Sequence, residues 1–308
     1  MFKKIYSNKP LVGLIIFAII VSILNPRFLS LNNVLNVLRQ TSINSVIAIG
    51  MTLVILTGGI DLSVGSILAL TGAFGASMIS GGINPILAVI ISIIIGCLFG
   101  LFNGFLISYA KLQPFIVTLV TMTLLRGATL VFTDGKPIPV RNGGDFFDNI
   151  GGGYIFDIPI PIYIMIALFI AAFYILNNLK FGRYIYAIGG NEEATKLSGV
   201  NTSKYKTLVY GVCGALSALA GVIVTSRLGS AQPTAGSGYE LDAIAAVVLG
   251  GTSLAGGIGT ITGTALGAVI IGVLGNALNL LNVSSYYQMM IKAIVILIAV
   301  LIDKKSSK

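Results

Sequence analysis

The chain has 308 residues, of which 56% are hydrophobic and only 9% are charged, whereas about a quarter of the residues in a soluble domain are charged. This composition excludes a soluble globular domain, and 38 Gly with 9 Pro also exclude a coiled coil. The net charge of +9 is spread over short segments between apolar stretches, so we expect no nucleic-acid partner. Because the sequence contains no histidine, it cannot build a Ser-His-Asp triad or a His-zinc site.

The apolar stretches predict an all-α polytopic membrane protein with about ten transmembrane helices, since about 20 residues cross the hydrocarbon layer. The ten stretches are Pro10–Leu24, Asn33–Thr57, Leu62–Ile79, Pro85–Ala110, Phe115–Thr133, Pro159–Leu179, Thr207–Gly229, Leu241–Gly251, Ile258–Leu281 and Ser285–Ile302. The eighth is too short to span alone, and we interpret it as a half-helix or part of a broken helix. The first is not interpreted as a signal peptide, because Asn25-Pro26-Arg27 follows it without a cleavage pattern.

The distribution of basic residues predicts the orientation of the chain. With ten spans, the segments on one side collect most of the basic residues, while loop 134–159 on the other side is rich in aspartate. The positive-inside rule then places both termini, and the hydrophilic loop 177–206, in the cytoplasm. Neither loop is long enough for a separate domain, so residues 1–308 form a single transmembrane domain in this interpretation.

An internal repeat is visible when residues 57–76 are set over residues 249–268 without gaps. Seven of the 20 positions are identical, including the pairs Gly58/Gly250 and Gly59/Gly251. The sequence leaves the relative orientation of the two copies open.

The segment Gly58–Gly65 lies between two apolar stretches with almost no loop, which predicts a helix break at or near the membrane. Gly58 and Gly59 are expected to end one helix, and Asp61 is expected to cap the next. Ser253 occupies the matching place in the second copy. Besides this capping role, a hinge or gate formed by Gly58, Gly59, Asp61, Gly250, Gly251 and Ser253 stays open.

The stretch Tyr186–Gly199 predicts a short cytoplasmic helix. Asn191 is its expected cap, Glu192 and Glu193 lie in its first turn, and Gly199 is its expected terminator. Such a short helix is not stable alone, which favours a partner surface over a solvated loop.

Several long runs of residues resemble the permease subunits of ribose ABC importers. They are Gly58–Gly65, Tyr186–Glu192, Ala231–Ala235 and Tyr239–Ser253. The resemblance implies a ten-span, vitamin B12 permease-like (type II) fold in the cytoplasmic membrane of a bacterium. It also implies a complex of two permease subunits, two ATP-binding subunits and a soluble sugar-binding protein. The family's ATPase-docking pattern, Glu-Ala-Ala with a later Gly, matches Glu193, Ala194 and Gly199, with Thr195 in place of the second Ala; we assign docking to Gly190, Asn191, Glu192, Glu193, Ala194 and Gly199.

The sequence itself requires that any ATP be bound by another chain. It has no phosphate-binding loop, because its only Gly-Lys pair, Gly135-Lys136, is followed by Pro137. We therefore predict a permease without catalytic, cofactor-binding or metal-binding residues.

Polar residues within the spans suggest a path for a neutral polyol. Asn276 and Asn279 recur at helical spacing, as do Thr118 and Thr121. An alternative role as hydrogen-bonding contacts between helices stays open. Arg126 and Lys292 need partners or water at membrane depth, and the sequence does not pair them with Asp61, Glu240 or Asp242.

Three kinds of function compete on these observations. The first is import of ribose, and the second is import of another sugar, a nucleoside or a sugar-like signal by the same architecture. An ion-coupled secondary transporter is a third interpretation, which would require coupling groups within the membrane. An intramembrane enzyme ranks last, since the spans carry no Gly-x-Ser-x-Gly motif.

Overall fold

The computed structural model describes residues 18–23 and 25–306, and nearly all of them lie in helices or in the short turns between helices. The helical elements are η1 (Pro26–Leu29), α3 (Leu31–Leu56), α4 (Val64–Ser80), α5 (Pro85–Ser108), α6 (Pro114–Thr133), α7 (Gly144–Gly152), α8 (Ile160–Asn178), α9 (Lys180–Gly190), α10 (Glu192–Leu197), α11 (Thr202–Leu228), α12 (Tyr239–Leu249), α13 (Ile261–Leu280) and α14 (Ser285–Ser306). Most of the first predicted span, Pro10–Leu24, lies outside the described residues.

The predicted spans agree with the helices to within a few residues, because Pro, Gly and Asn mark the helix ends. Within the described chain, six helices are long and apolar enough to cross a membrane, namely α3, α5, α6, α8, α11 and α13. Helix α4, with 17 residues, is apolar but shorter, and α12 has 11 residues. A total of ten spans therefore stays a prediction.

The loops between the predicted spans contain more structure than the sequence predicted. Residues 134–159 contain α7 and the two-residue strands β1 (Ile138–Pro139), β2 (Tyr154–Ile155) and β3 (Ile158–Pro159). Strand β1 pairs antiparallel with β4 (Ser230–Ala231), and β2 pairs with β3. Helix α7 is fixed on α11, because Ser226 Oγ accepts from the Gly151 amide at 2.8 Å and donates to the Phe147 carbonyl at 2.5 Å.

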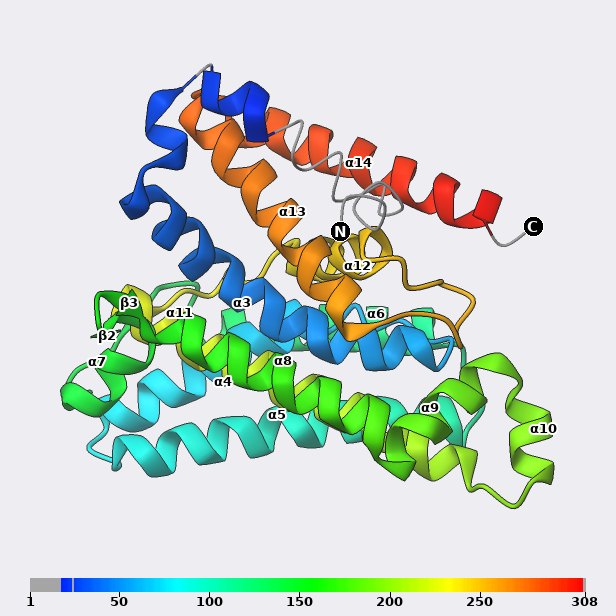
Figure 1. Ribbon diagram of the computed structural model, residues 1–308. Helices are drawn as coiled ribbons and strands as arrows, with labels where there is room; N and C mark the ends of the chain where they lie inside the picture. The colour runs from blue at the N-terminus through cyan, green and yellow to red at the C-terminus, as the bar shows by residue number, and fades with distance from the viewer. Residues whose placement is uncertain (1–17, 24, 307–308) are drawn as a thin grey trace.

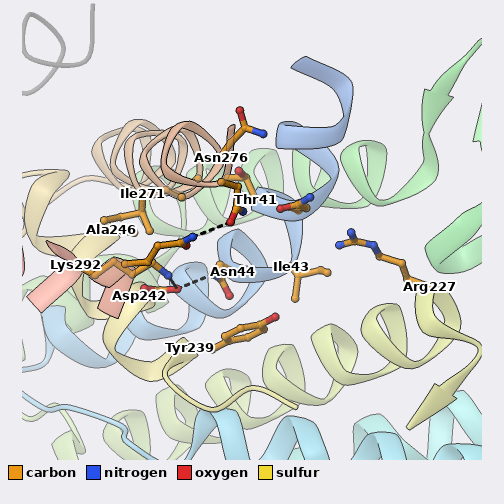
Figure 2. A pocket seen from close by; sticks show the side chains of 16 residues that line it. Thr41, Ile43, Asn44, Arg227, Tyr239, Asp242, Ala246, Ile271, Asn276 and Lys292 are labelled. Carbon is orange, nitrogen blue, oxygen red and sulfur yellow. Dashed lines mark hydrogen bonds and ion pairs between the residues drawn. The ribbon is translucent and has the colours of Figure 1, made fainter. Parts of the chain in front are cut away.

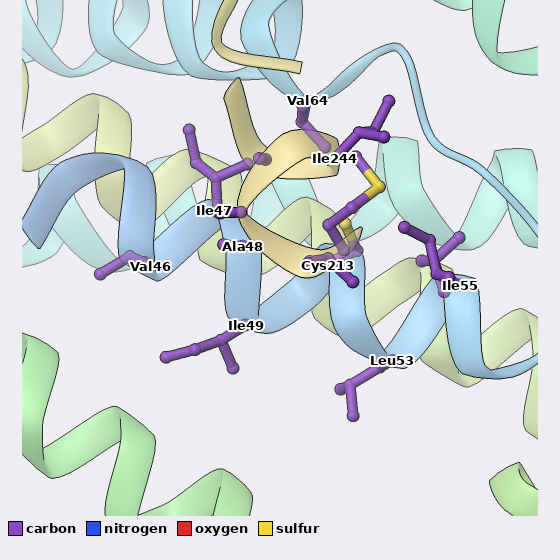
Figure 3. Close-up of a cluster of buried hydrophobic side chains, with 14 of the residues drawn as sticks. Val46, Ile47, Ala48, Ile49, Leu53, Ile55, Val64, Cys213 and Ile244 are labelled. Carbon is purple, nitrogen blue, oxygen red and sulfur yellow. The ribbon is translucent and has the colours of Figure 1, made fainter. Parts of the chain in front are cut away.

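The core is built around α3 and α11, whose residues are mostly buried (Figure 1). Figure 3 shows branched aliphatic side chains of α3, such as Ile47 and Ile55, packed near Cys213 of α11 and Ile244 of α12. Helices α5, α6 and α8 instead direct most of their apolar side chains outward. Outward apolar faces are what a lipid environment requires. Helices α9 and α10 lie at one end of this bundle and α7 at the other (Figure 1).

Helices α5 and α11 approach closely through glycine. A Cβ atom added at Gly100 would collide with the Tyr210 carbonyl, and one added at Gly214 would collide with the Gly96 carbonyl. Small residues at such spacing allow two membrane helices to pack backbone against backbone.

Replacement of Gly100 by Ala should therefore destabilise the protein by about 1 to 3 kcal/mol, because the added methyl group overpacks the contact with α11. Gly127→Ala in α6 is the matched control, since a Cβ there would have no neighbour within 4 Å, and a change below about 0.5 kcal/mol is expected. Thermal unfolding in detergent measures both. Equal unfolding temperatures for the two variants would contradict this packing.

Candidate functional site

The first helix break is held by a buried carboxylate. Helix α3 ends at Leu56, and Gly58 follows at φ +76°, as expected for a glycine that terminates a helix. Asp61 is fully buried, and its Oδ1 accepts from the Ser63 amide at 2.9 Å and from the Ser63 hydroxyl at 2.6 Å. The N-cap residue of α4 is Ser63, so the prediction that Asp61 caps α4 is wrong. Leu62 and Ser63 form a turn between Asp61 and α4. Asp61 stabilises that turn through its two hydrogen bonds with Ser63.

A chain of buried side chains connects this break to two further helices. Asn103 of α5 donates from Nδ2 to Ser63 Oγ at 3.0 Å, and its Oδ1 accepts from Thr121 Oγ1 of α6 at 2.6 Å. Thr121 therefore acts as an interhelical contact here. Thr118 donates to the Pro114 carbonyl of its own helix at 2.8 Å.

The second break resembles the first in its local hydrogen bonding. Helix α12 ends at Leu249 with Gly250 as C-cap, and Gly251 follows at φ +84°. Ser253 Oγ accepts from the Ala255 amide, two residues further on, at 3.3 Å, just as Asp61 accepts from Ser63. The N-cap of α13 is Thr260. The prediction that Ser253 caps this helix is therefore wrong. The two breaks also touch, because the Gly257 amide donates to the Leu56 carbonyl at 3.0 Å.

The short helix predicted within Tyr186–Gly199 is present as α10. Asn191 is its N-cap and accepts from the Ala194 amide at 2.9 Å, and Gly199 lies just beyond its end at φ +86°. Glu192 forms an ion pair of 2.9 Å with Lys206 of α11. Partial burial would raise the pKa of Glu192, but the Lys206 ammonium, aided by Lys111, lowers it below its ordinary value. The pair therefore stabilises this loop at neutral pH and weakens only when the pH falls through that lowered pKa.

The outer surface of α10 is exposed. Glu193 and Ala194 are exposed, and the Leu197 side chain is 89% exposed. The sequence analysis did not predict an exposed leucine on this six-residue helix. Gly190, which was predicted to belong to the same site, is the last residue of the preceding helix α9.

A polar cavity of about 330 Å³ lies between α3, α11, α12, α13 and α14. Figure 2 shows Lys292 and Asn44 converging on Asp242 from two sides. Lys292 Nζ lies 2.8 Å from Asp242 Oδ2, and Asn44 Nδ2 donates to the same oxygen at 3.3 Å. The charged partner of Lys292, which the sequence left unassigned, is thus Asp242.

The predicted asparagines contribute to this cavity, whereas the predicted threonines lie elsewhere. Asn276 and Asn279 both line it. Asn276 exchanges hydrogen bonds of 2.9 and 3.0 Å with Asn33, and Asn279 accepts from Gln288 at 2.8 Å. Residues that line the cavity but were not predicted to do so include Gln40, Thr41, Asn44, Arg227, Tyr239 and Gln288. Their polar character at membrane depth is the signal that a span-by-span analysis could have used.

Two oxygens of this lining lack hydrogen-bond partners. Thr41 Oγ1 and Asn44 Oδ1 are buried and accept no hydrogen bond from the described residues. Buried polar groups are nearly always paired, so a bound polar molecule or water would satisfy them.

Arg126 forms hydrogen bonds with the segment that precedes α12. Its Nη1 donates to the carbonyls of Pro233 at 2.7 Å and Ala235 at 2.9 Å. It lies twelve residues after the start of α6, or about 18 Å along the axis of this 20-residue helix. Arg126 and Glu240 also line a second cavity of about 430 Å³ beside α6.

Loss of the Thr121 hydroxyl should weaken the link between α5 and α6. Thr121→Val leaves the buried Asn103 oxygen without this donor, at a cost of about 1 to 3 kcal/mol. Thr118→Val is the matched control, because that buried hydroxyl bonds only within α6. Denaturant or thermal unfolding compares the two, and an equal loss would show that the Asn103 contact adds no stability.

Comparisons with known proteins give one family match and several relatives that align over nearly the whole chain. The family model described as "Branched-chain amino acid transport system / permease component" matches residues 33–300. The chain is 58% identical to the ribose import permease protein RbsC of Haemophilus influenzae, over 98% of this chain and 94% of the relative. It is also 58% identical to that of Bacillus subtilis, over 97% and 92%.

A third relative transports a different sugar by name. The D-allose transport system permease protein AlsC of Escherichia coli is 39% identical, over 95% of this chain and 91% of the relative. No solved structure gives a significant match. Several apolar helices, the extent of the family match and the identity to these permeases lead to one conclusion: the chain is a membrane protein that belongs to the branched-chain amino acid transport system / permease component family.

Proposed function

We propose that this chain is the permease subunit of an ATP-driven importer that receives ribose from a soluble sugar-binding protein and releases it into the cytoplasm. The observation that carries this proposal is the 54 to 58% identity, over nearly the whole chain, to ribose import permeases of several bacteria. The D-allose and xylose permeases are less similar, at 39% and 35%. Transport of another sugar is therefore the second candidate.

The chemistry of the cavity beside α12 supports a sugar as the cargo. Its wall offers amide groups from Asn44, Asn276 and Asn279, together with the Asp242–Lys292 pair. These groups donate and accept hydrogen bonds in several directions, as the hydroxyl groups of a pentose require. The volume of about 330 Å³ falls in the range of small-molecule sites.

The exposed face of α10 supports a partner ATPase. The chain contains no phosphate-binding loop, so ATP hydrolysis belongs to the partner in this proposal. Glu193, Ala194 and Leu197 lie on the part of loop 177–206 that faces away from the bundle. Two ATP-binding subunits, one for each permease, complete the complex.

A second permease copy is part of the proposed assembly. Arg126 and Glu240 line a cavity that opens at the surface of α6, at a depth where charged groups facing lipid are costly. A second copy of this chain, or water held between two copies, would remove that cost. The ten-span, type II architecture is the arrangement that we propose for each copy.

The proposed orientation places both termini and loop 177–206 in the cytoplasm, because those segments are the most basic. The sugar-binding protein then meets the opposite end, where α7 exposes Asp145 and Asp148.

Reconstitution tests the function directly. The chain, in liposomes with its ATPase and binding protein, should accumulate ribose when ATP is inside the vesicles. The chain alone should accumulate none, and D-allose and xylose serve as control sugars. Uphill uptake by the chain alone on a proton or sodium gradient would overturn the proposal, and preferential uptake of D-allose or xylose would select the second candidate.

Docking of the ATPase should depend on Leu197. Leu197→Ser removes an exposed apolar anchor, and we expect the affinity for the ATPase in detergent to fall about tenfold or more. Lys204→Ser, at an exposed position in the same cytoplasmic region, is the control and should bind as the unmodified chain does. Co-purification and titration measure the affinity. Equal affinities for both variants would show that the ATPase does not dock on this face of α10.

A further inference from the structure

Three segments from distant parts of the chain meet at the end of α9. They are the end of α3 at Leu56–Gly58, the end of α9 at Gly189–Gly190, and the second break at Ala255–Gly257. The Gly257 amide donates to the Leu56 carbonyl at 3.0 Å. A Cβ added at Gly256 would lie 2.9 Å from the Gly58 nitrogen and 3.1 Å from the Gly189 Cα atom. The backbones of all three segments are therefore in direct contact.

Gly189 sits between the two breaks with no room for a side chain. A Cβ atom at this position would collide with both the Leu56 carbonyl and the Gly257 amide nitrogen. Its own backbone is in the ordinary helical region, so the conformation does not demand glycine. The close approach of two other backbones is the physical reason for glycine here.

The next residue provides a natural contrast. A Cβ added at Gly190 would meet no atom within 4 Å, and its φ angle is also not in the left-handed region. The two adjacent glycines therefore differ only in whether a methyl group strikes the breaks.

A side chain adds a second contact between α9 and the second break. Tyr186, one helical turn before Gly189, donates from its hydroxyl to the Gly259 carbonyl at 2.9 Å. Helix α9 thus holds the loop between α12 and α13 through the Tyr186 hydrogen bond and through close backbone contacts at Gly189. Asn191 alone separates α9 from α10. The connection between the contacts of α9 and the exposed face of α10 is therefore short.

We propose that Gly189 and Tyr186 form a junction that links the position of α10 to both helix breaks, and that this junction couples ATP use to sugar transport. The proposal rests on the function proposed above. A displacement of α10 moves α9 with it, and the close fit at Gly189 passes the displacement to the ends of α3 and α12. Gly189 and Tyr186 are positioning residues, since they act through the breaks rather than on the sugar.

The test compares sugar transported per ATP hydrolysed in the reconstituted complex. Gly189→Ala should lower this ratio about tenfold, while the ATPase still binds and hydrolyses ATP. Gly127→Ala in α6, where an added Cβ would meet no atom within 4 Å, is the control and should match the unmodified chain. Tyr186→Phe, which removes only the hydroxyl, should lower the ratio by a smaller factor. An unchanged ratio for Gly189→Ala overturns the junction; if that variant fails to assemble, an unchanged ratio for Tyr186→Phe overturns it.

A second readout needs no sugar and separates failure of the junction from failure of the proposed function. Ile258 lies in the second break and is 67% exposed, so Ile258→Cys offers a thiol whose maleimide labelling rate can be followed. Addition of ATP to the complex should change that rate, and Gly189→Ala should abolish the change. An equal change with and without Gly189→Ala contradicts the junction, whereas absent ribose uptake with a normal labelling change contradicts only the assigned cargo.

Discussion

The need to satisfy backbone polar groups away from water governs this structure. Within hydrocarbon, an unpaired amide or carbonyl costs several kcal/mol, so irregular backbone must lie against protein. The chain interrupts its helices at residues 57–63 and 250–260, and the second interruption pairs with the end of α3, where the Gly257 amide donates to the Leu56 carbonyl. The same rule explains Arg126, which donates hydrogen bonds to carbonyls of the turns before α12.

Features that depend on local sequence could be predicted closely. Helix α3 was expected at Asn33–Thr57 and lies at Leu31–Leu56, and α5 begins at Pro85 as expected. Proline at a first helical position and glycine after a last one act on their immediate neighbours only. For the same reason Asn191, Glu192 and Gly199 could be assigned correct places in and around α10 without knowledge of the fold.

Features that depend on which helices are neighbours could not be predicted in this way. The spacing of polar residues along α6 says nothing about Asn103, whose position on α5 decides that Thr121 joins two helices. Likewise Asp242 and Lys292 are separated by 50 residues and meet only after α12 and α14 pack. Helix α9 was missed because its residues are mixed in polarity, and its apolar contacts become apparent only when α3 and α8 are present.

The first turn of α12 lies between the two cavities. Tyr239 and Asp242 line the cavity of about 330 Å³, whereas Glu240 lines the one of about 430 Å³. One short turn is therefore a common partition between the two spaces. A lateral shift of that turn enlarges one chamber at the expense of the other, so the two chambers change volume in opposite directions. Arg126 connects α6 to this partition, because it binds the Pro233 and Ala235 carbonyls in the turns that lead into α12.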